Sequence, residues 1–336
     1  MSKSRRANTV SFGFDFQVNA AIILMLENIE DLQSLRLEGN YEDIELQMNN
    51  GDYILAQAKA VEHSSTDFKN VRKKLKEALV TLSEGYQKAG NTRSLILITN
   101  SPNPLNEKAS KSLFYGHAHR SFSSLPESSQ KIILGYLSGI AEPLDTSQFM
   151  IQVVPFETDD DREKYKVVRQ VIDDFVGDLN LNIAGISKTL FTLWHDDIFK
   201  NSTKSNPDIK LSKKDIIWPI LVIATDVERC EDNFAEQFDA GLYDEIVHQY
   251  SSLIDSCCEK CEFFIKVLCD YNSFQSDKKS AEKCVEFAMT KWPDYISELK
   301  LDNADDETQR GLVQIILYNI VRNRIVINKV KRGVNL

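Results

Sequence analysis

The sequence predicts an α/β domain, built on a mixed sheet flanked by helices, followed by an all-α domain. Residues 34–61 alternate between apolar and polar side chains in three short runs separated by turn signals, as antiparallel strands do. Residues 93–100 are almost continuously apolar, which is typical of a strand buried on both faces. From residue 180 onward the periodicity is almost exclusively helical. We therefore expect two domains, 1–178 and 179–336.

Composition limits the classes of function. A chain of 336 residues exceeds what one hydrophobic core usually serves, and 42% hydrophobic with 27% charged residues is typical of a globular protein. The net charge of −10 argues against constitutive, non-specific DNA binding, so activity on DNA would need a local basic patch, a basic partner or assembly. We expect a cytoplasmic protein with reduced thiols and no membrane segment, because neither a signal peptide nor an apolar run of about 20 residues is evident.

Two turn signals set the strand pairing in residues 34–61. Gly39-Asn40 has the composition of a two-residue hairpin loop, and Asn49–Gly51 that of a three-residue loop. The second loop places Asp43 opposite Gln57. A slip of one residue would mix the polar and apolar faces, so the alternation favours this register.

The first turn brings a further acid to the same face. A two-residue loop at Gly39-Asn40 pairs Glu38 with Tyr41, which places the Glu38 side chain on the face of Asp43. Lys59 reaches that face through the two-residue period of its strand. One small patch is therefore expected to collect Glu38, Asp43, Gln57 and Lys59.

These residue types predict the hydrolysis of a phosphodiester bond. Neighbouring carboxylates repel each other unless a cation lies between them, and hard cations such as Mg²⁺ or Mn²⁺ take oxygen ligands. We expect Asp43, Glu38 and Gln57 to bind the metal, the last through its amide oxygen or through the neighbouring carbonyl of Ala58. Lys59 would hold the attacking water or stabilise charge on the phosphate. Metal and lysine together would activate water and neutralise the phosphorane.

The order of acid, hairpin and Gln-x-Lys resembles the PD-(D/E)xK nuclease superfamily, in its variant with Gln in place of the second acid. The sequence is also similar to the nuclease domain of bacterial anti-phage effectors. That similarity is carried by Gly13–Gln17, Glu38, Glu42–Ile44, Gln57–Lys59 and Leu95–Asn100. It covers roughly the first half of the chain.

The resemblance implies a restriction-endonuclease-like mixed sheet and a Mg²⁺-dependent site. Its catalytic residues would be Asp43, Gln57, Lys59, Glu38 and Gln17. The family usually has two adjacent acids at the position that Glu42 and Asp43 occupy here, and Glu42 is a conservative departure from its pattern. Alternation along the strand predicts that the Glu42 side chain points away from the site.

The resemblance also implies partners. Relatives include the double-stranded DNA endonucleases of CBASS systems and the nuclease subunit of Lamassu systems, which works with an SMC-like ATPase. The helical second half fits the Lamassu type, because the CBASS relatives carry an α/β nucleotide-sensing domain there. The implied partners are double-stranded DNA, the ATPase, an accessory subunit and further copies of the chain, with activation by release or clustering. The alternative is a non-catalytic scaffold that keeps the nuclease-like fold.

A helix at 67–89, with Ser65 or Thr66 as its N-cap, carries the best candidates for contacts with the DNA backbone. Its apolar stripe is expected to pack on the sheet. Its outer face carries Lys69, Arg72, Lys73, Lys74 and Lys76.

The rest of the first domain follows from periodicity and turn signals. We expect a basic, flexible arm at 1–11, a helix at 14–32, a short helix and loop within 104–126, a helix at 127–138, a strand at 147–155 and a helix from the acidic segment 157–162 to about 179. The acids of that segment are assigned to helix capping.

Two other constellations could bind a metal. His117 and His119 share a face only in a strand, and no third ligand lies nearby in the sequence, so we assign them a structural or surface role. Cys258 and Cys261 have zinc-like spacing but follow an apolar helical stripe, so we expect core residues. Beyond residue 180, Ser212 and Asp215 resemble a capping box ahead of a helix that contains Pro219.

Overall fold

The computed structural model describes residues 2–61, 70–157, 159–181, 183–227, 233–239, 241–259, 261–298 and 305–336. The chain has a mixed α/β part and a C-terminal helical part, as the sequence predicts. It forms two compact units, residues 1–219 with 334–336, and residues 220–333. The predicted boundary at residue 178 therefore lies inside the first unit, because the next helix still packs on the sheet domain.

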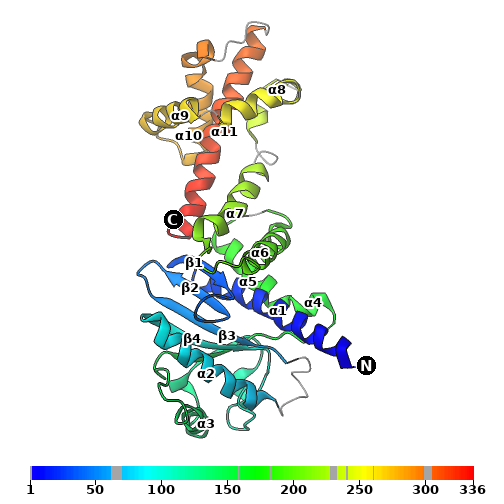
Figure 1. Ribbon diagram of the computed structural model, residues 1–336. Coiled ribbons are helices and arrows are strands. Elements are labelled where there is room, and N and C mark those ends of the chain that lie inside the picture. The colour runs from blue at the N-terminus through cyan, green and yellow to red at the C-terminus, as the bar shows by residue number, and fades with distance from the viewer. Residues whose placement is uncertain are drawn as a thin grey trace. The chain divides into compact units, whose positions relative to one another are not determined.

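The first unit is organised around one seven-stranded mixed sheet (Figure 1). Its strands are β1 (Leu32–Leu37), β2 (Ile44–Met48), β3 (Tyr53–Lys59), β4 (Thr92–Thr99), β5 (Ala118–Ser121), β6 (Phe149–Val153) and β7 (Leu211–Ser212). The strand order is β5-β6-β4-β3-β2-β1-β7. The three middle strands β3, β4 and β6 run parallel, and every other pairing is antiparallel.

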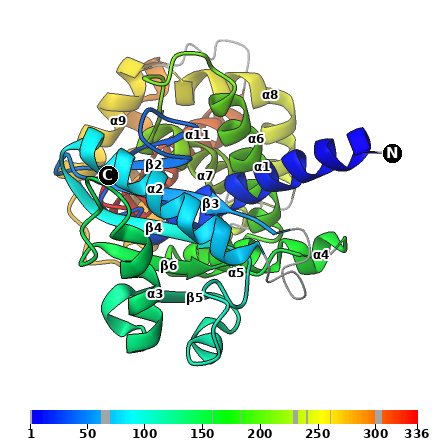
Figure 2. The ribbon, with the colours of Figure 1, turned by 60° about the horizontal axis from the view of Figure 1, so that its bottom comes forward.

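Helices cover both faces of this sheet. One face is covered by α2 (Val71–Ala89) and α3 (Glu127–Leu137), whose apolar residues join those of β3, β4 and β6 in one core. Figure 2 shows α2 lying across β3 and β4. The other face is covered by α1 (Ser2–Glu27), α5 (Lys166–Asp178) and α6 (Ile186–Ser202), which pack against one another.

The predicted pairing of β2 with β3 is confirmed. Ile44 pairs with Ala56, and the backbone amide of Met48 donates to the carbonyl of Asp52 at 2.8 Å across the three-residue loop. The predicted pairing at the first turn is wrong by two residues, because the Glu38 amide donates to the carbonyl of Asp43 rather than facing Tyr41. A shift of two residues leaves the faces unchanged and closes a four-residue loop instead of a two-residue one.

The N-terminal helix differs from its predicted bounds at both ends. α1 begins at Ser2, so the expected flexible arm at 1–11 is helical. Phe12 holds this end through a ring contact with Phe156, with centroids 5.4 Å apart. The helix ends at Glu27, five residues before the predicted end at residue 32, because residues 28–31 turn into β1. Within α1, Thr9–Glu27 is long and apolar enough to span a bilayer, but 56% of this segment is buried inside the protein, which a core helix also shows.

Three further segments test the predictions. The segment 104–126 contains a strand, β5, which was not predicted. Asp160 caps α4 (Asp161–Lys164) by accepting the amide of Arg162 at 2.9 Å, which confirms the capping role of this acidic segment. The helix predicted to follow is interrupted at Tyr165, between α4 and α5.

The capping box at Ser212 and Asp215 is also confirmed. The Ser212 amide donates to the Asp215 carboxylate at 2.9 Å, and the Asp215 amide donates back to the Ser212 hydroxyl at 3.2 Å. The box opens α7 (Lys213–Val227), and Pro219 lies inside this helix.

The second unit has a separate, aromatic core. Its helices include α8 (Leu242–Glu259), α9 (Cys261–Ser273), α10 (Ser280–Lys291) and α11 (Asp306–Gly333). Phe234 stacks on Tyr318 with ring centroids 3.9 Å apart. Gly311 lets α11 approach α8, since a Cβ there would lie 2.6 Å from Ile246. Cys284 is buried and Cys269 is exposed, while the side chains of Cys258 and Cys261 lie outside the described residues.

A candidate metal-dependent site at the β1-β2-β3 meander

The polar patch expected in residues 34–61 assembles in the structure. The side-chain amide nitrogen of Gln57 donates to the Asp43 carboxylate, and the backbone amide of Ala58 donates to the same carboxylate oxygen at 3.1 Å. Glu38 is the cross-strand neighbour of Asp43. Gln17 reaches in from α1 and hydrogen-bonds both Glu38 and Asp43. Elements far apart in the sequence therefore meet at one end of the meander.

Lys59 completes the group from the end of β3. Its positive charge lowers the pKa values of the neighbouring carboxyl groups, although burial and repulsion dominate there. The net effect is that burial raises the pKa of Asp43, against the charge of Lys59 and the hydrogen bonds from Gln17, Ala58 and Gln57. Burial and the charge of Asp43 likewise raise the pKa of Glu38, which lies at the exposed rim.

Glu42 belongs to this cluster, which corrects the expectation that its side chain points away. β2 begins only at Ile44, so Glu42 lies in the loop, where strand alternation does not apply. Its side chain is 7% exposed, and burial together with the charge of Asp43 raises its pKa to about 8. Its carboxylate oxygen Oε1 is buried without a hydrogen-bond partner. The charge of Lys59 thus acts on all three carboxyl groups, those of Glu38, Glu42 and Asp43.

Two glycines allow this loop to close. A Cβ on Gly85 of α2 would lie 2.7 Å from the carbonyl oxygen of Tyr41, so the helix packs directly on the loop backbone. A Cβ on Gly39 would lie 2.2 Å from the carboxyl carbon of Glu45, which folds back into the loop. That carboxylate accepts the backbone amides of Tyr41 and Glu42. Both glycines therefore serve a close approach.

The carboxyl cluster fits a hard divalent cation, with one change to the predicted ligands. Glu38, Glu42 and Asp43 supply carboxylate oxygens, and the buried, unpartnered Oε1 of Glu42 requires a positive partner when ionised. Gln57 presents its amide nitrogen to Asp43, while its oxygen accepts the Thr81 hydroxyl. Gln57 could therefore bind a cation through its side chain only after its amide rotates.

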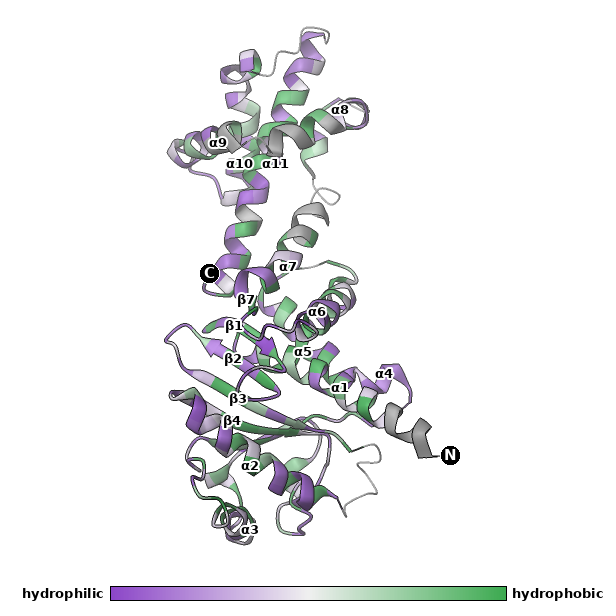
Figure 3. Cartoon of the chain, viewed as in Figure 1, coloured by the Kyte–Doolittle hydropathy of each residue, from purple (hydrophilic) through white to green (hydrophobic). Residues whose placement is uncertain are grey.

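Several basic side chains on the outer face of α2 already have partners within the protein. Arg72 donates through Nε to the carbonyl of Leu105 at 3.0 Å, and the exposed Lys73 lies 3.8 Å from Glu77. The Lys74 ammonium donates to the carbonyl of Ala60. Lys76 is exposed, and hydrophilic turns of α2 are visible in Figure 3. Lys69 and the proposed caps Ser65 and Thr66 lie outside the described residues.

Asp15, in the same Gly13–Gln17 segment, belongs to a separate network. Its carboxylate accepts from the Lys164 ammonium at 2.5 Å and from the Tyr165 hydroxyl at 2.9 Å, and it lies 3.3 Å from His195 Nε2. Burial would raise its pKa, but these hydrogen bonds bring the pKa below its ordinary value. The network joins α1 to α4 and α6, which is a structural role.

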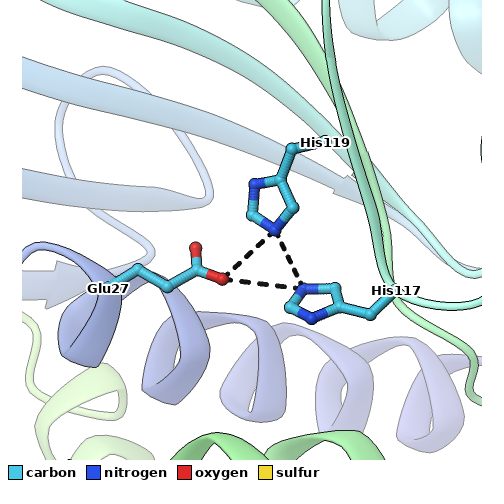
Figure 4. Close-up of side chains that lie close together, drawn as sticks. All are labelled: Glu27, His117 and His119. Carbon is cyan, nitrogen blue, oxygen red and sulfur yellow. Dashed lines mark hydrogen bonds and ion pairs between the residues drawn. The ribbon is translucent and has the colours of Figure 1, made fainter.

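Sequence reasoning missed a second group of potential ligands. His117 and His119 lie beside Glu27, the last residue of α1, and the three side chains point toward one another (Figure 4). Burial lowers the pKa of His117, against the opposing charge of Glu27. The third ligand, which is absent from the sequence neighbourhood of the two histidines, comes from a helix end some 90 residues away in the chain. Comparisons of the chain with protein families, with curated proteins and with solved structures returned no match.

Proposed function

We propose that this protein is a metal-dependent DNA endonuclease, whose catalytic centre is the carboxyl cluster with Lys59. The observation that supports it is the convergence of Gln17, Glu38, Glu42, Asp43, Gln57 and Lys59 from three elements. Three acids next to a lysine and two amides match the needs of phosphodiester hydrolysis better than those of a static fold.

The residues have distinct roles in this proposal. Glu38, Glu42 and Asp43 hold Mg²⁺ or Mn²⁺, which when bound lowers the pKa of water and neutralises charge on the phosphate. The Lys59 ammonium stabilises the charge that develops on the phosphate oxygens or orients the attacking water. Gln17 fixes the orientation of Glu38 and Asp43 through its hydrogen bonds. Double-stranded DNA would contact Lys73, Lys76 and their neighbours on α2.

The biological setting belongs to the same proposal. The resemblance to anti-phage nucleases suggests a cytoplasmic effector of a Lamassu-like system, held inactive by an SMC-like ATPase and an accessory subunit. The net charge of −10 supports dependence on partners or on clustering, because an isolated acidic chain is repelled by DNA. Residues 179–336 would make those contacts.

One observation favours a non-catalytic scaffold as the second candidate. Asp43 is already satisfied by the Gln57 amide and the Ala58 backbone amide, so the patch can exist without a cation. A scaffold would use the same fold for contacts alone. It would neither bind Mn²⁺ at this cluster nor cut DNA.

Plasmid cleavage by the full chain in Mg²⁺ or Mn²⁺ tests the proposal. Asp43→Ala and Lys59→Ala should abolish cleavage while the far-ultraviolet circular dichroism stays that of the wild type. Lys131→Ala, which removes an exposed lysine of α3 paired with Glu127, is the matched control and should cut normally.

A thermal-shift titration distinguishes an enzyme that is inactive without its partners from a scaffold that binds no metal. Mn²⁺ should raise the melting temperature of the wild type but not of Asp43→Ala. No cleavage together with no Mn²⁺-dependent shift would favour the scaffold.

A further inference from the structure

A second group of polar side chains lies at the edge of the sheet, at β5, and contains none of the residues of the carboxyl cluster. Glu27 ends α1, His119 lies in β5, and His117 lies two residues before it. The fourth residue, Gln152, pairs with His119 across β5 and β6. Residues paired across two strands, and residues two apart in an extended strand, share one face of a sheet.

The four side chains approach one another at nearly equal distances. Nε2 of His117 lies 3.2 Å from Nε2 of His119, and these two atoms lie 3.6 Å and 3.2 Å from Oε1 of Glu27. The side-chain amide nitrogen of Gln152 lies 3.1 Å from His117, 3.2 Å from His119 and 3.3 Å from Glu27 Oε1. All six separations fall between 3.1 and 3.6 Å.

These separations are those of the corners of a tetrahedral coordination shell. A zinc ion takes imidazole nitrogen and carboxylate oxygen at about 2.0–2.2 Å, so its four ligand atoms lie about 3.3–3.6 Å from one another. The four positions therefore need little movement to hold such an ion, provided that an oxygen replaces the amide nitrogen of Gln152 at the fourth position. Hydrogen bonding alone satisfies them less well, because the amide of Gln152 has to serve three acceptors.

The amide of Gln152 carries the strongest indication. The side chain is 0% exposed, and its oxygen Oε1 is buried without a hydrogen-bond partner. A half-turn of the amide exchanges its oxygen and nitrogen with almost no change in shape. The oxygen then faces the atoms of Glu27, His117 and His119 as the fourth potential ligand.

We propose that Glu27, His117, His119 and Gln152 form a zinc site. Imidazole nitrogen favours zinc over Mg²⁺ or Ca²⁺, which prefer sites made only of oxygen. Four protein ligands leave no open position for water or substrate, so the ion has a structural role. It fastens the short edge strand β5 to the end of α1, which packs on the other side of the sheet from α2.

The site is accessible to the ion. The side chains of His117, Glu27 and His119 are 23%, 26% and 39% exposed, whereas Gln152 forms the closed inner end. Zinc can thus enter and leave the folded protein. A chelator should remove it without unfolding the chain.

Metal content and cobalt spectroscopy on the purified full-length protein test this proposal. Chelated protein should rebind one equivalent of zinc with a rise in melting temperature, and Co²⁺ should give the intense visible bands of tetrahedral coordination. Thiolate-to-cobalt charge transfer should be absent, since the proposed shell contains no sulfur. Its presence, a six-coordinate cobalt spectrum or the lack of a stoichiometric ion would overturn the proposal.

Variants assign the ligands. His119→Ala should lower zinc affinity by roughly 100-fold or more, and Glu27→Gln by at least about tenfold. The matched control is His248→Ala, which removes an exposed histidine of α8 and should bind zinc like the wild type. Gln152→Glu should retain the ion, because it restores an oxygen ligand, whereas Gln152→Leu should weaken it.

Two outcomes separate loss of the ion from loss of the fold. The zinc-free melting temperatures of wild type and Glu27→Gln should agree, because Glu27 lies at the exposed end of α1. The zinc-dependent rise should persist in Asp43→Ala, whose change lies in the other cluster. Equal zinc affinity in wild type, His119→Ala and Glu27→Gln would contradict the assignment.

Discussion

The carboxyl cluster (Glu38, Glu42 and Asp43) and the histidine cluster (Glu27, His117, His119 and Gln152) lie at the same sheet. They differ in charge, in the segments that supply their residues and in position. The first collects Glu38, Glu42 and Asp43 around Lys59, mostly from one continuous stretch of chain. The second collects imidazoles, an amide and one carboxylate from three distant segments. A set of carboxylates favours a hard cation, whereas a set that includes imidazole nitrogens favours zinc.

The two clusters also lie on opposite faces of the sheet. Gln57 aligns with Leu97 and Ile151 across the parallel strands, and Gln152 is the next residue along β6. Successive residues of a strand point to opposite faces. Under the two proposals, one sheet would carry a reactive site on one face and a structural ion on the other, with little direct coupling between them.

The largest expected effect is that a substitution in one cluster removes the property proposed for that cluster, DNA cleavage or zinc binding, and leaves the other property unchanged. Asp43→Ala should reduce DNA cleavage by at least about 100-fold, because it removes transition-state stabilisation at the reacting phosphate. Its zinc content should stay at the wild-type level. His119→Ala should lose the zinc while cleavage by the folded protein persists. Loss of both cleavage and zinc in either variant would show that the two clusters act as one functional unit.

The pH dependence of stability should come chiefly from the carboxyl cluster. The pKa of Glu42 is raised to about 8, so the folded protein binds a proton that the unfolded chain releases near its ordinary pKa of 4.5. Without added metal, the contribution of Glu42 to the free energy of unfolding should therefore be highest below about pH 4.5. It should fall by a few kcal/mol as the pH rises toward 8. Glu38 and Asp43 have raised pKa values and act with the same sign.

Glu42→Gln isolates this contribution. The variant should melt at a higher temperature than the wild type at pH 8 and show a flatter profile, measured by calorimetry across pH 5–8.5, since the neutral amide carries no buried charge. Mn²⁺ should stabilise the wild type most at high pH. A variant profile as steep as that of the wild type would show that Glu42 does not cause the pH dependence of stability.

The close packing of α2 on the loop gives a smaller, purely steric effect. Gly85→Ala should destabilise the protein by about 1–3 kcal/mol, because its Cβ would lie 2.7 Å from the Tyr41 carbonyl oxygen. Gly135→Ala is the matched control within α3, where a Cβ meets nothing within 4 Å. That change should be neutral or stabilise by up to about 1 kcal/mol in urea unfolding.

The smallest effect should be seen at the basic face of α2. Lys76→Ala should weaken DNA binding only a few-fold and lower the slope of log affinity against log salt by about 1. Lys131→Ala on α3 should leave both quantities unchanged. Fluorescence anisotropy at several salt concentrations would measure them, and an equal slope for both variants would exclude Lys76 from the DNA-binding surface.

Local sequence determined the part of the molecule where contacts are short in range. The alternation in β2 and β3 and the Asn49–Gly51 loop specify which residue faces which, so the sequence alone places Asp43 opposite Gln57. The error at Gly39-Asn40 shifted the register by two residues and preserved the faces. Side-chain orientation in a regular strand depends only on the parity of position.

Tertiary structure decided the remainder. Glu42 enters the cluster because loop residues follow no period and because Gly85 lets α2 approach them. Glu27 meets His117 and His119 because α1 crosses the sheet and ends beside β5, a contact between residues some 90 positions apart. Periodicity carries information over one element, whereas the meeting of distant elements is set by the packing of the whole sheet and its helices.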